Sequence, residues 1–285
     1  MNFSRFIVSA SLVALVSCQP ASFAVGAENC YAIAKVPAEK QIYTTSVVVL
    51  LDETVVFDVT QREHIQAQVR SLIVHGNEIR AFTFSAFRDG RYTMPVMDVR
   101  LALPLDEAAR YTMRKDSIRD FDTCQIVSMN RAKKEIDHVL EGYFERSSSA
   151  LANSDILATL KQVGDTVIPA FRGKRKQIVL VSDMLENSDI SSFYGAGGSI
   201  RTIDVGVELA KVEKRSLLSD FRGASVFVIG AGVAPTTGKV SAASYRAQSV
   251  MAPLNSFWAQ YFERSNSKLI EFGQPLLLKK IGDAK

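Results

Sequence analysis

Three stretches of consecutive apolar residues constrain the fold of this chain more than any other feature. They span residues 47–51, 178–181 and 226–229, and stretches with helical spacing lie between them. A strand without polar alternation is typical of a parallel sheet that is covered on both faces. Since such strands alternate with helices here, the sequence predicts a doubly wound α/β fold, with a mostly parallel central sheet and helices on both faces.

Other patterns in the sequence predict the remaining strands and helices of this fold. Residues 79–87 and 92–103 alternate around a turn, which predicts a hairpin that supplies one antiparallel edge strand. Further elements are expected as helices over 61–74, 126–144, 155–167, 209–221 and 241–265, and as short strands over 199–205 and 269–272. The charged stretch 104–123 is expected to be a partly helical insertion. No proline-rich linker divides the chain, so residues 28–285 are expected to form one domain.

Residues 1–27 are predicted to be a bacterial export signal. An apolar run over residues 6–16 follows Arg5, and this run is too short to span a membrane. Small residues favour cleavage after Ala24 or Ala27, which would release a periplasmic protein. Alternatively, residues 15–18 resemble a lipobox. The signal would then comprise residues 1–17, and a lipidated Cys18 would anchor the protein to a membrane.

Export would leave two ordinary thiols, Cys30 and Cys124. In an oxidising compartment these two residues can form a disulfide, and the alternative is two separate buried thiols. With 3 Cys and 3 His at no short ligand spacing, a structural zinc site is not expected.

Polar oxygens gather where the predicted strands end. Asp52 and Asp183 each follow an apolar strand, Thr54 lies two residues after Asp52, and Ser154 with Asp155 opens a predicted helix. Ligands of open α/β sheets bind beyond the carboxyl ends of the strands, and Mg²⁺ prefers oxygen ligands. The sequence therefore indicates a candidate site for Mg²⁺ or another divalent cation. The alternative is that loop N–H groups and hydroxyls satisfy the two aspartates.

These motifs resemble those of von Willebrand factor A-type domains. The resemblance rests on Asp52-x-Thr54 after a strand, on Ser154-Asp155 at the head of a helix, on the strand that ends at Asp183, and on the order of elements over residues 44–275. It implies the Rossmann-like fold of that family. It also implies a metal-ion-dependent adhesion site, in which a partner's carboxylate completes the coordination of a divalent cation.

That site would comprise Asp52, Thr54, Ser154 and Asp183, with Glu53 and Asp155 beside it. The chain departs from the family pattern, Asp-x-Ser-x-Ser, at Val56, which cannot ligate a cation. Loss of one oxygen, replaceable by water, weakens a site for a divalent cation without forbidding it.

The resulting hypothesis is a non-catalytic module that binds a protein partner in the cell envelope. A Mg²⁺-dependent hydrolase of phosphatase type is the alternative, although Thr54 stands where its second aspartate would be. A small-molecule receptor of the periplasm is a third hypothesis, which the sequence neither supports nor excludes.

Other ligands are not expected. The loop Gly230-Ala231-Gly232 lacks the third glycine of a dinucleotide site, so no nucleotide is predicted. Because 34 basic residues nearly balance 30 acidic residues, the composition does not predict a surface that binds nucleic acid. A basic cluster over residues 172–176 is typical of a solvated loop, and contact with a membrane surface is the alternative.

Overall fold

A computed structural model describes residues 30–35, 43–88, 91–150, 153–195, 199–233 and 247–281, without the side chains of residues 86–88 and 91. The predicted signal segment, with Cys18 and both predicted cleavage sites, lies outside these residues. Within them, no helix combines the length and apolar character needed to cross a membrane.

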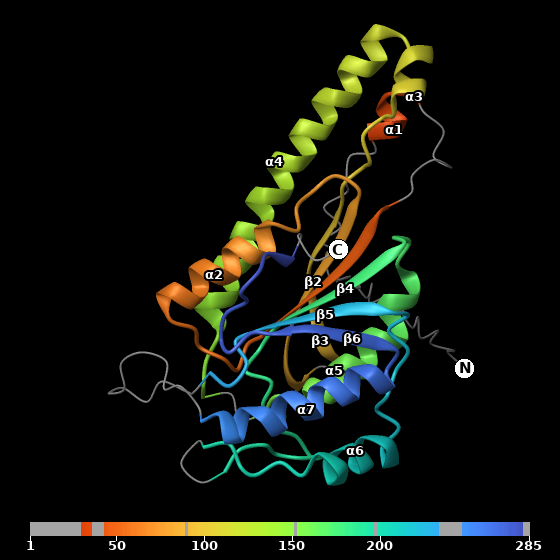
Figure 1. Cartoon of the computed structure of the whole chain (residues 1–285). Helices are drawn as coiled ribbons and strands as arrows, with labels where there is room; N and C mark the ends of the chain where they lie inside the picture. The colour runs from red at the N-terminus through yellow and green to blue at the C-terminus, as the bar shows by residue number, and fades with distance from the viewer. Residues whose placement is uncertain are drawn as a thin grey trace, which may run out of the picture.

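A six-stranded sheet forms the centre of the molecule (Figure 1). Its strands are β1 (Thr45–Asp52), β2 (Asn77–Arg88), β3 (Arg91–Arg100), β4 (Arg175–Val181), β5 (Ala224–Ile229) and β6 (Ser267–Phe272). Their order is β3-β2-β1-β4-β5-β6, and all neighbours are parallel except β2 and β3. The predicted parallel sheet with one antiparallel edge strand is confirmed.

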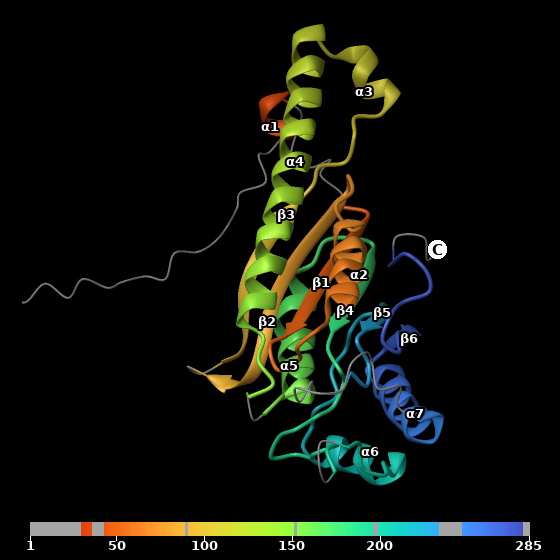
Figure 2. The same ribbon diagram turned by 90° about the vertical axis from the view of Figure 1, so that its left-hand side faces the viewer.

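Helices cover both faces of the sheet, as predicted. Helices α2 (Val59–Arg70) and α4 (Lys115–Arg146) cover one face, and α5 (Ile156–Gln162), α6 (Val205–Lys214) and α7 (Gln248–Arg264) lie on the other (Figures 1 and 2). Side chains of β1 alternate between the two cores: Val47 and Val49 face α2 and α4, whereas Val48 and Leu50 face the other layer. Both faces are buried, which explains why the strand sequence shows no polar alternation.

An arm extends beyond the sheet at the edge where the parallel strands begin. We define the arm as α1 (Cys30–Ile33), α3 (Glu107–Thr112) and residues 115–127 of α4; Figure 2 shows α4 continuing past the strands. Cys30 and Cys124 form a disulfide, which confirms the predicted bridge. Around it Tyr31 packs edge-on against Phe121 in a small apolar core.

The predicted insertion, residues 104–123, contains α3 and the first turns of α4. Helix α4 therefore begins at Lys115 and not at residue 126. Its first turns face only the small core of the arm, so few of their residues are apolar and the helical period is weak in the sequence.

Two predictions near α6 were wrong. Residues 199–204 form no strand, and in that stretch only Ile200 makes an isolated bridge, to Tyr194. Helix α6 spans Val205–Lys214 and not residues 209–221. Asp204 caps its first turn by accepting a hydrogen bond from the Val207 N–H (3.1 Å), and Ser216 adopts a left-handed backbone conformation soon after its end.

Candidate functional site

The candidate site lies between β1 and β4, where the direction in which successive strands are added to the sheet reverses. Strands β1 and β4 are neighbours in the sheet although more than 120 residues separate Asp52 from Val181 in sequence. From this pair the chain winds outward in both directions, through β2 and β3 on one side and β5 and β6 on the other. The crevice at the carboxyl ends of such a strand pair is the usual place for a ligand in a doubly wound sheet.

The Asp52 carboxylate joins three chain segments at this place. Its Oδ1 accepts hydrogen bonds from the backbone N–H (3.0 Å) and the hydroxyl (2.6 Å) of Thr54. Its Oδ2 accepts hydrogen bonds from the hydroxyls of Ser154 (3.1 Å) and Ser182 (2.7 Å). The side chain is 0% exposed, and burial raises its pKa while these hydrogen bonds oppose the shift. We call these four residues the Asp52 cluster.

Asp183 does not belong to the Asp52 cluster. Its Oδ1 accepts a hydrogen bond from the Leu185 N–H (2.9 Å), and its Oδ2 accepts one from the Tyr194 hydroxyl (2.8 Å). Successive side chains of an extended segment point in opposite directions, so Ser182 faces Asp52 and Asp183 does not. Three of the four predicted ligands, Asp52, Thr54 and Ser154, therefore lie together in the structure. The fourth, Asp183, lies apart from them, and the sequence analysis missed its neighbour Ser182.

The two acids expected beside the site also have structural contacts. The Glu53 carboxylate pairs with Arg146 of α4 (Nε to Oε1, 3.3 Å). The N–H of Asp155 donates to the carbonyl of Ser85 (3.0 Å), which ties the start of α5 to β2. These contacts position the loops around the Asp52 cluster.

As arranged, these residues do not fit a divalent cation. Each Asp52 oxygen already accepts two hydrogen bonds, Asp183 is turned toward Tyr194, and Val56 offers no oxygen. In the described ranges, no group of three or more His, Cys, Asp or Glu side chains could hold a metal ion. The metal-ligating role that the sequence indicated for Asp52, Thr54, Ser154 and Asp183 is therefore left to the calorimetry described in the Discussion, and no step below depends on it.

The phosphatase-like alternative gains no support from this geometry. An aspartyl nucleophile needs an exposed carboxylate oxygen, whereas Asp52 is fully buried and each of its oxygens accepts two hydrogen bonds.

Sequence reasoning missed Glu186, which connects the β4–α6 loop to α5. Its side chain is 0% exposed, and its carboxyl group accepts hydrogen bonds from the Leu157 N–H (3.0 Å) and the Ser188 hydroxyl. Burial raises the pKa of Glu186 to about 8. No signal in the sequence could have found this role, because a glutamate in a loop is ordinarily solvated.

Two aromatic side chains, from α4 and α7, donate hydrogen bonds to the backbone at the edge of the sheet that carries the Asp52 cluster. The hydroxyl of Tyr143 in α4 donates to the carbonyl of Asp52 (2.8 Å), and Nε1 of Trp258 in α7 donates to the carbonyl of Met184 (2.9 Å). Both side chains are fully buried. Trp258 is thus part of the core, and the edge of the sheet is fixed from both helical layers.

Comparison with known proteins gives distant structural likenesses only. The sequence matches no protein-family profile and no curated protein. A conserved hypothetical protein, BatB from Bacteroides thetaiotaomicron, shares 11% identity over 81% of this chain and 90% of its own, with a TM-score of 0.33. An aerotolerance-related membrane protein from Bacteroides fragilis shares 10% over 80% and 91%, with a TM-score of 0.33. The pilus adhesin SpaC from Lactobacillus rhamnosus GG shares 10% over 82% and 28%, with a TM-score of 0.41.

At these identities and TM-scores, the likenesses assign no function. The sheet itself defines the class of protein: it is a Rossmann-like α/β fold with the strand order β3-β2-β1-β4-β5-β6. With its antiparallel edge strand and its strand-end motifs, the chain resembles von Willebrand factor A-type domains in fold as well as in sequence.

Proposed function

We propose that this chain is a binding module of the bacterial cell envelope, which engages a protein partner at the carboxyl ends of β1 and β4 without catalysing a reaction. The observation that carries the proposal is the Asp52 cluster. It fixes the loop after β1, the segment before α5 and the end of β4 to one buried carboxylate. A set of loops held in one arrangement before binding loses little conformational freedom when a partner docks.

The proposed location outside the cytoplasm has two supports. The predicted signal over residues 1–27 would direct export. The disulfide between Cys30 and Cys124 suits an oxidising compartment, since cytosolic thiols are kept reduced.

A pair of exposed valines at the two ends of α2 allows a direct test. Val59 lies at the edge that carries the Asp52 cluster and is 71% exposed, whereas Val74, just beyond α2, lies at the opposite edge and is 46% exposed. A photo-crosslinking amino acid is placed at each position in turn, and cells are irradiated. We expect a discrete crosslinked protein from position 59 and none from position 74.

Equal crosslinking from both valines would contradict the proposed binding edge. Absence of any product from position 59, in cells that contain the folded protein, would contradict the proposed function.

A further inference from the structure

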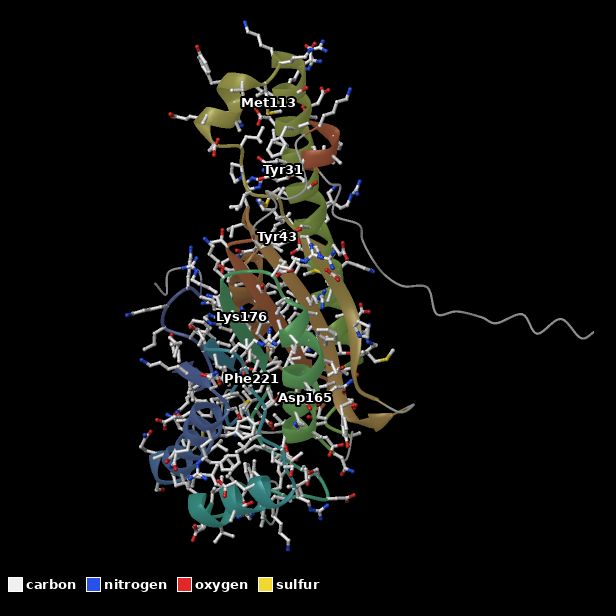
Figure 3. The ribbon with its side chains drawn as sticks, turned by 90° about the vertical axis from the view of Figure 1, so that its right-hand side faces the viewer. Tyr31, Tyr43, Met113, Asp165, Lys176 and Phe221 are labelled. Atoms are coloured by element: carbon white, nitrogen blue, oxygen red, sulfur yellow. A yellow bond between two sulfur atoms is a disulfide. The ribbon has the colours of Figure 1, made fainter. Side chains whose placement is uncertain are left out.

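A group of basic side chains occupies the edge where the parallel strands begin, opposite the Asp52 cluster. We define the basic edge as Arg172, Lys174, Arg175 and Lys176 at the start of β4, Arg222 before β5, and Lys268 in β6. The strand register aligns Lys268 with Ser225 and Ser225 with Gln177, so the starts of these strands lie side by side. Figure 3 views the molecule from this side and labels Lys176.

Among these cations, Arg222 has an acidic neighbour, Asp220, whose pKa its backbone N–H and its charge lower. No ion pair within the described ranges involves any residue of the basic edge. All are exposed except Lys176, which is half-buried and donates to the carbonyl of Gly173 (3.1 Å). The nearby Glu78 is buried and accepts from Ser46 and Gly173, and Asp220 accepts from the N–H of Arg222. The basic edge therefore carries a net positive charge.

The side chains at this edge favour binding to a uniformly charged surface over binding to a protein partner. Protein interfaces depend on buried aromatic or aliphatic anchors. In the described segments that carry the basic edge, the exposed large hydrophobic side chain is Ile270 of β6, at 42% exposure. Basic side chains that are spread over several strand starts, with one exposed aliphatic side chain among them, suit a membrane that presents many anionic headgroups.

The arm lies on the side of the sheet where the parallel strands begin. Strand β3 ends here at Arg100 and leads into the arm, and Cys30 also lies in the arm (Figures 1 and 3). At the other edge, the ends of β1 and β4 carry two buried acids, Asp52 and Asp183.

We propose that the basic edge binds the anionic phospholipid headgroups of a membrane surface. The candidate binding site then faces away from the bilayer, toward the compartment. This inference does not rest on the proposed function, because vesicle binding and partner crosslinking concern opposite edges of the sheet.

The test is co-sedimentation of the exported protein with phosphatidylcholine vesicles, with and without about 30 mol% phosphatidylglycerol. We expect preference for the anionic vesicles at about 50 mM NaCl and loss of that preference near 500 mM, because salt screens exposed charges. Comparison with pure phosphatidylcholine separates this effect from that of a lipid on Cys18, which would bind both kinds of vesicle.

Two double variants remove the same charge from different faces. Lys174→Gln with Arg175→Gln is expected to lower the partition coefficient about 25-fold, since each cation contributes about fivefold. Lys133→Gln with Lys134→Gln, on the exposed side of α4, should change it less than about threefold. Unchanged thermal unfolding of both variants confirms that they are folded.

Equal loss in both variants, or no preference for anionic vesicles at low salt, would overturn the proposal. Binding of the basic edge to an acidic protein, with no binding to vesicles, would overturn it too.

Discussion

Asp52 is the residue on which the proposed binding edge most depends. A buried carboxylate that accepts four hydrogen bonds cannot be removed without leaving its donors unsatisfied. We expect Asp52→Ala to lower the free energy of unfolding by about 2–4 kcal/mol. Asp106→Ala, at the exposed N-cap of α3, should cost only about 1 kcal/mol. Urea denaturation checks both values, and equal costs would show that the Asp52 cluster is not a structural centre.

The contacts of Asp52 also bear on whether the candidate site binds a divalent cation. Because its oxygens are occupied and Val56 supplies no ligand, we expect isothermal calorimetry to detect no binding of Mg²⁺ or Mn²⁺ at millimolar concentration. Asp183→Ala should behave like the unchanged protein in this measurement. Saturable heat that disappears in Asp183→Ala would instead establish the metal site that the family resemblance implies.

Glu186 should make stability depend on pH. Its pKa is about 8 in the folded protein against 4.5 for an ordinary glutamate, so between these pH values the folded state keeps a proton that the unfolded chain has released. The stability linked to this group is complete below about pH 4.5 and is lost as the pH rises through about 8, with an upper limit of roughly 4–5 kcal/mol. Asp52, whose pKa is also raised, adds a dependence of the same sign.

Glu186→Gln removes the titrating group and keeps a side chain of similar size. We expect this variant to lose most of the decline in unfolding free energy between about pH 5 and pH 8, measured by urea denaturation. Glu263→Gln, at an exposed position of α7, should retain the decline. An undiminished decline in Glu186→Gln would show that another group controls it.

The sequence could identify Asp52, Thr54 and Ser154 because hydroxyls and acids at strand and helix ends form a recognisable pattern. It could not identify Ser182, since the choice between Ser182 and Asp183 depends on which side of the extended chain faces β1. Nor could it identify Tyr143, because an aromatic residue on a helix is ordinarily part of the core, and its hydroxyl finds its partner only in the folded protein.

At the level of elements, the strands of the centre were predictable and the helix boundaries were not. β1, β4 and β5 are buried on both faces, so an unbroken apolar run identifies each of them. The start of α4 and the bounds of α6 depend on local contacts, such as the small core beside Phe121 and the cap at Asp204. Such contacts leave little trace in hydrophobic periodicity.

The arm depends on its disulfide because its apolar core is small. We expect Cys30→Ser with Cys124→Ser to speed hydrogen exchange in residues 115–127 of α4, while residues 132–144, packed on the sheet, remain protected. Ser128→Ala, which removes the hydroxyl next to both sulfurs and keeps the bridge, should leave exchange unchanged. Equal protection of both halves of α4 without the bridge would show that the arm needs no covalent support.

For the whole molecule, the mature N-terminus defines how the protein is held in the envelope. We expect intact mass spectrometry of the exported protein to show a chain that begins at Val25 or Glu28, as cleavage after Ala24 or Ala27 requires. Cys18→Ser should then leave the mass unchanged. A lipid-modified chain beginning at Cys18, and its loss in Cys18→Ser, would establish the lipoprotein form.

Helix α4 has a mechanical consequence. Its 32 residues form one uninterrupted rod about 48 Å long, which begins in the arm at the disulfide end and reaches Asp52 through Tyr143. A force that is applied to the arm is therefore transmitted along α4 to the edge that we propose binds the partner. Helix α4 thus forms a rigid connection between the arm and the proposed binding edge.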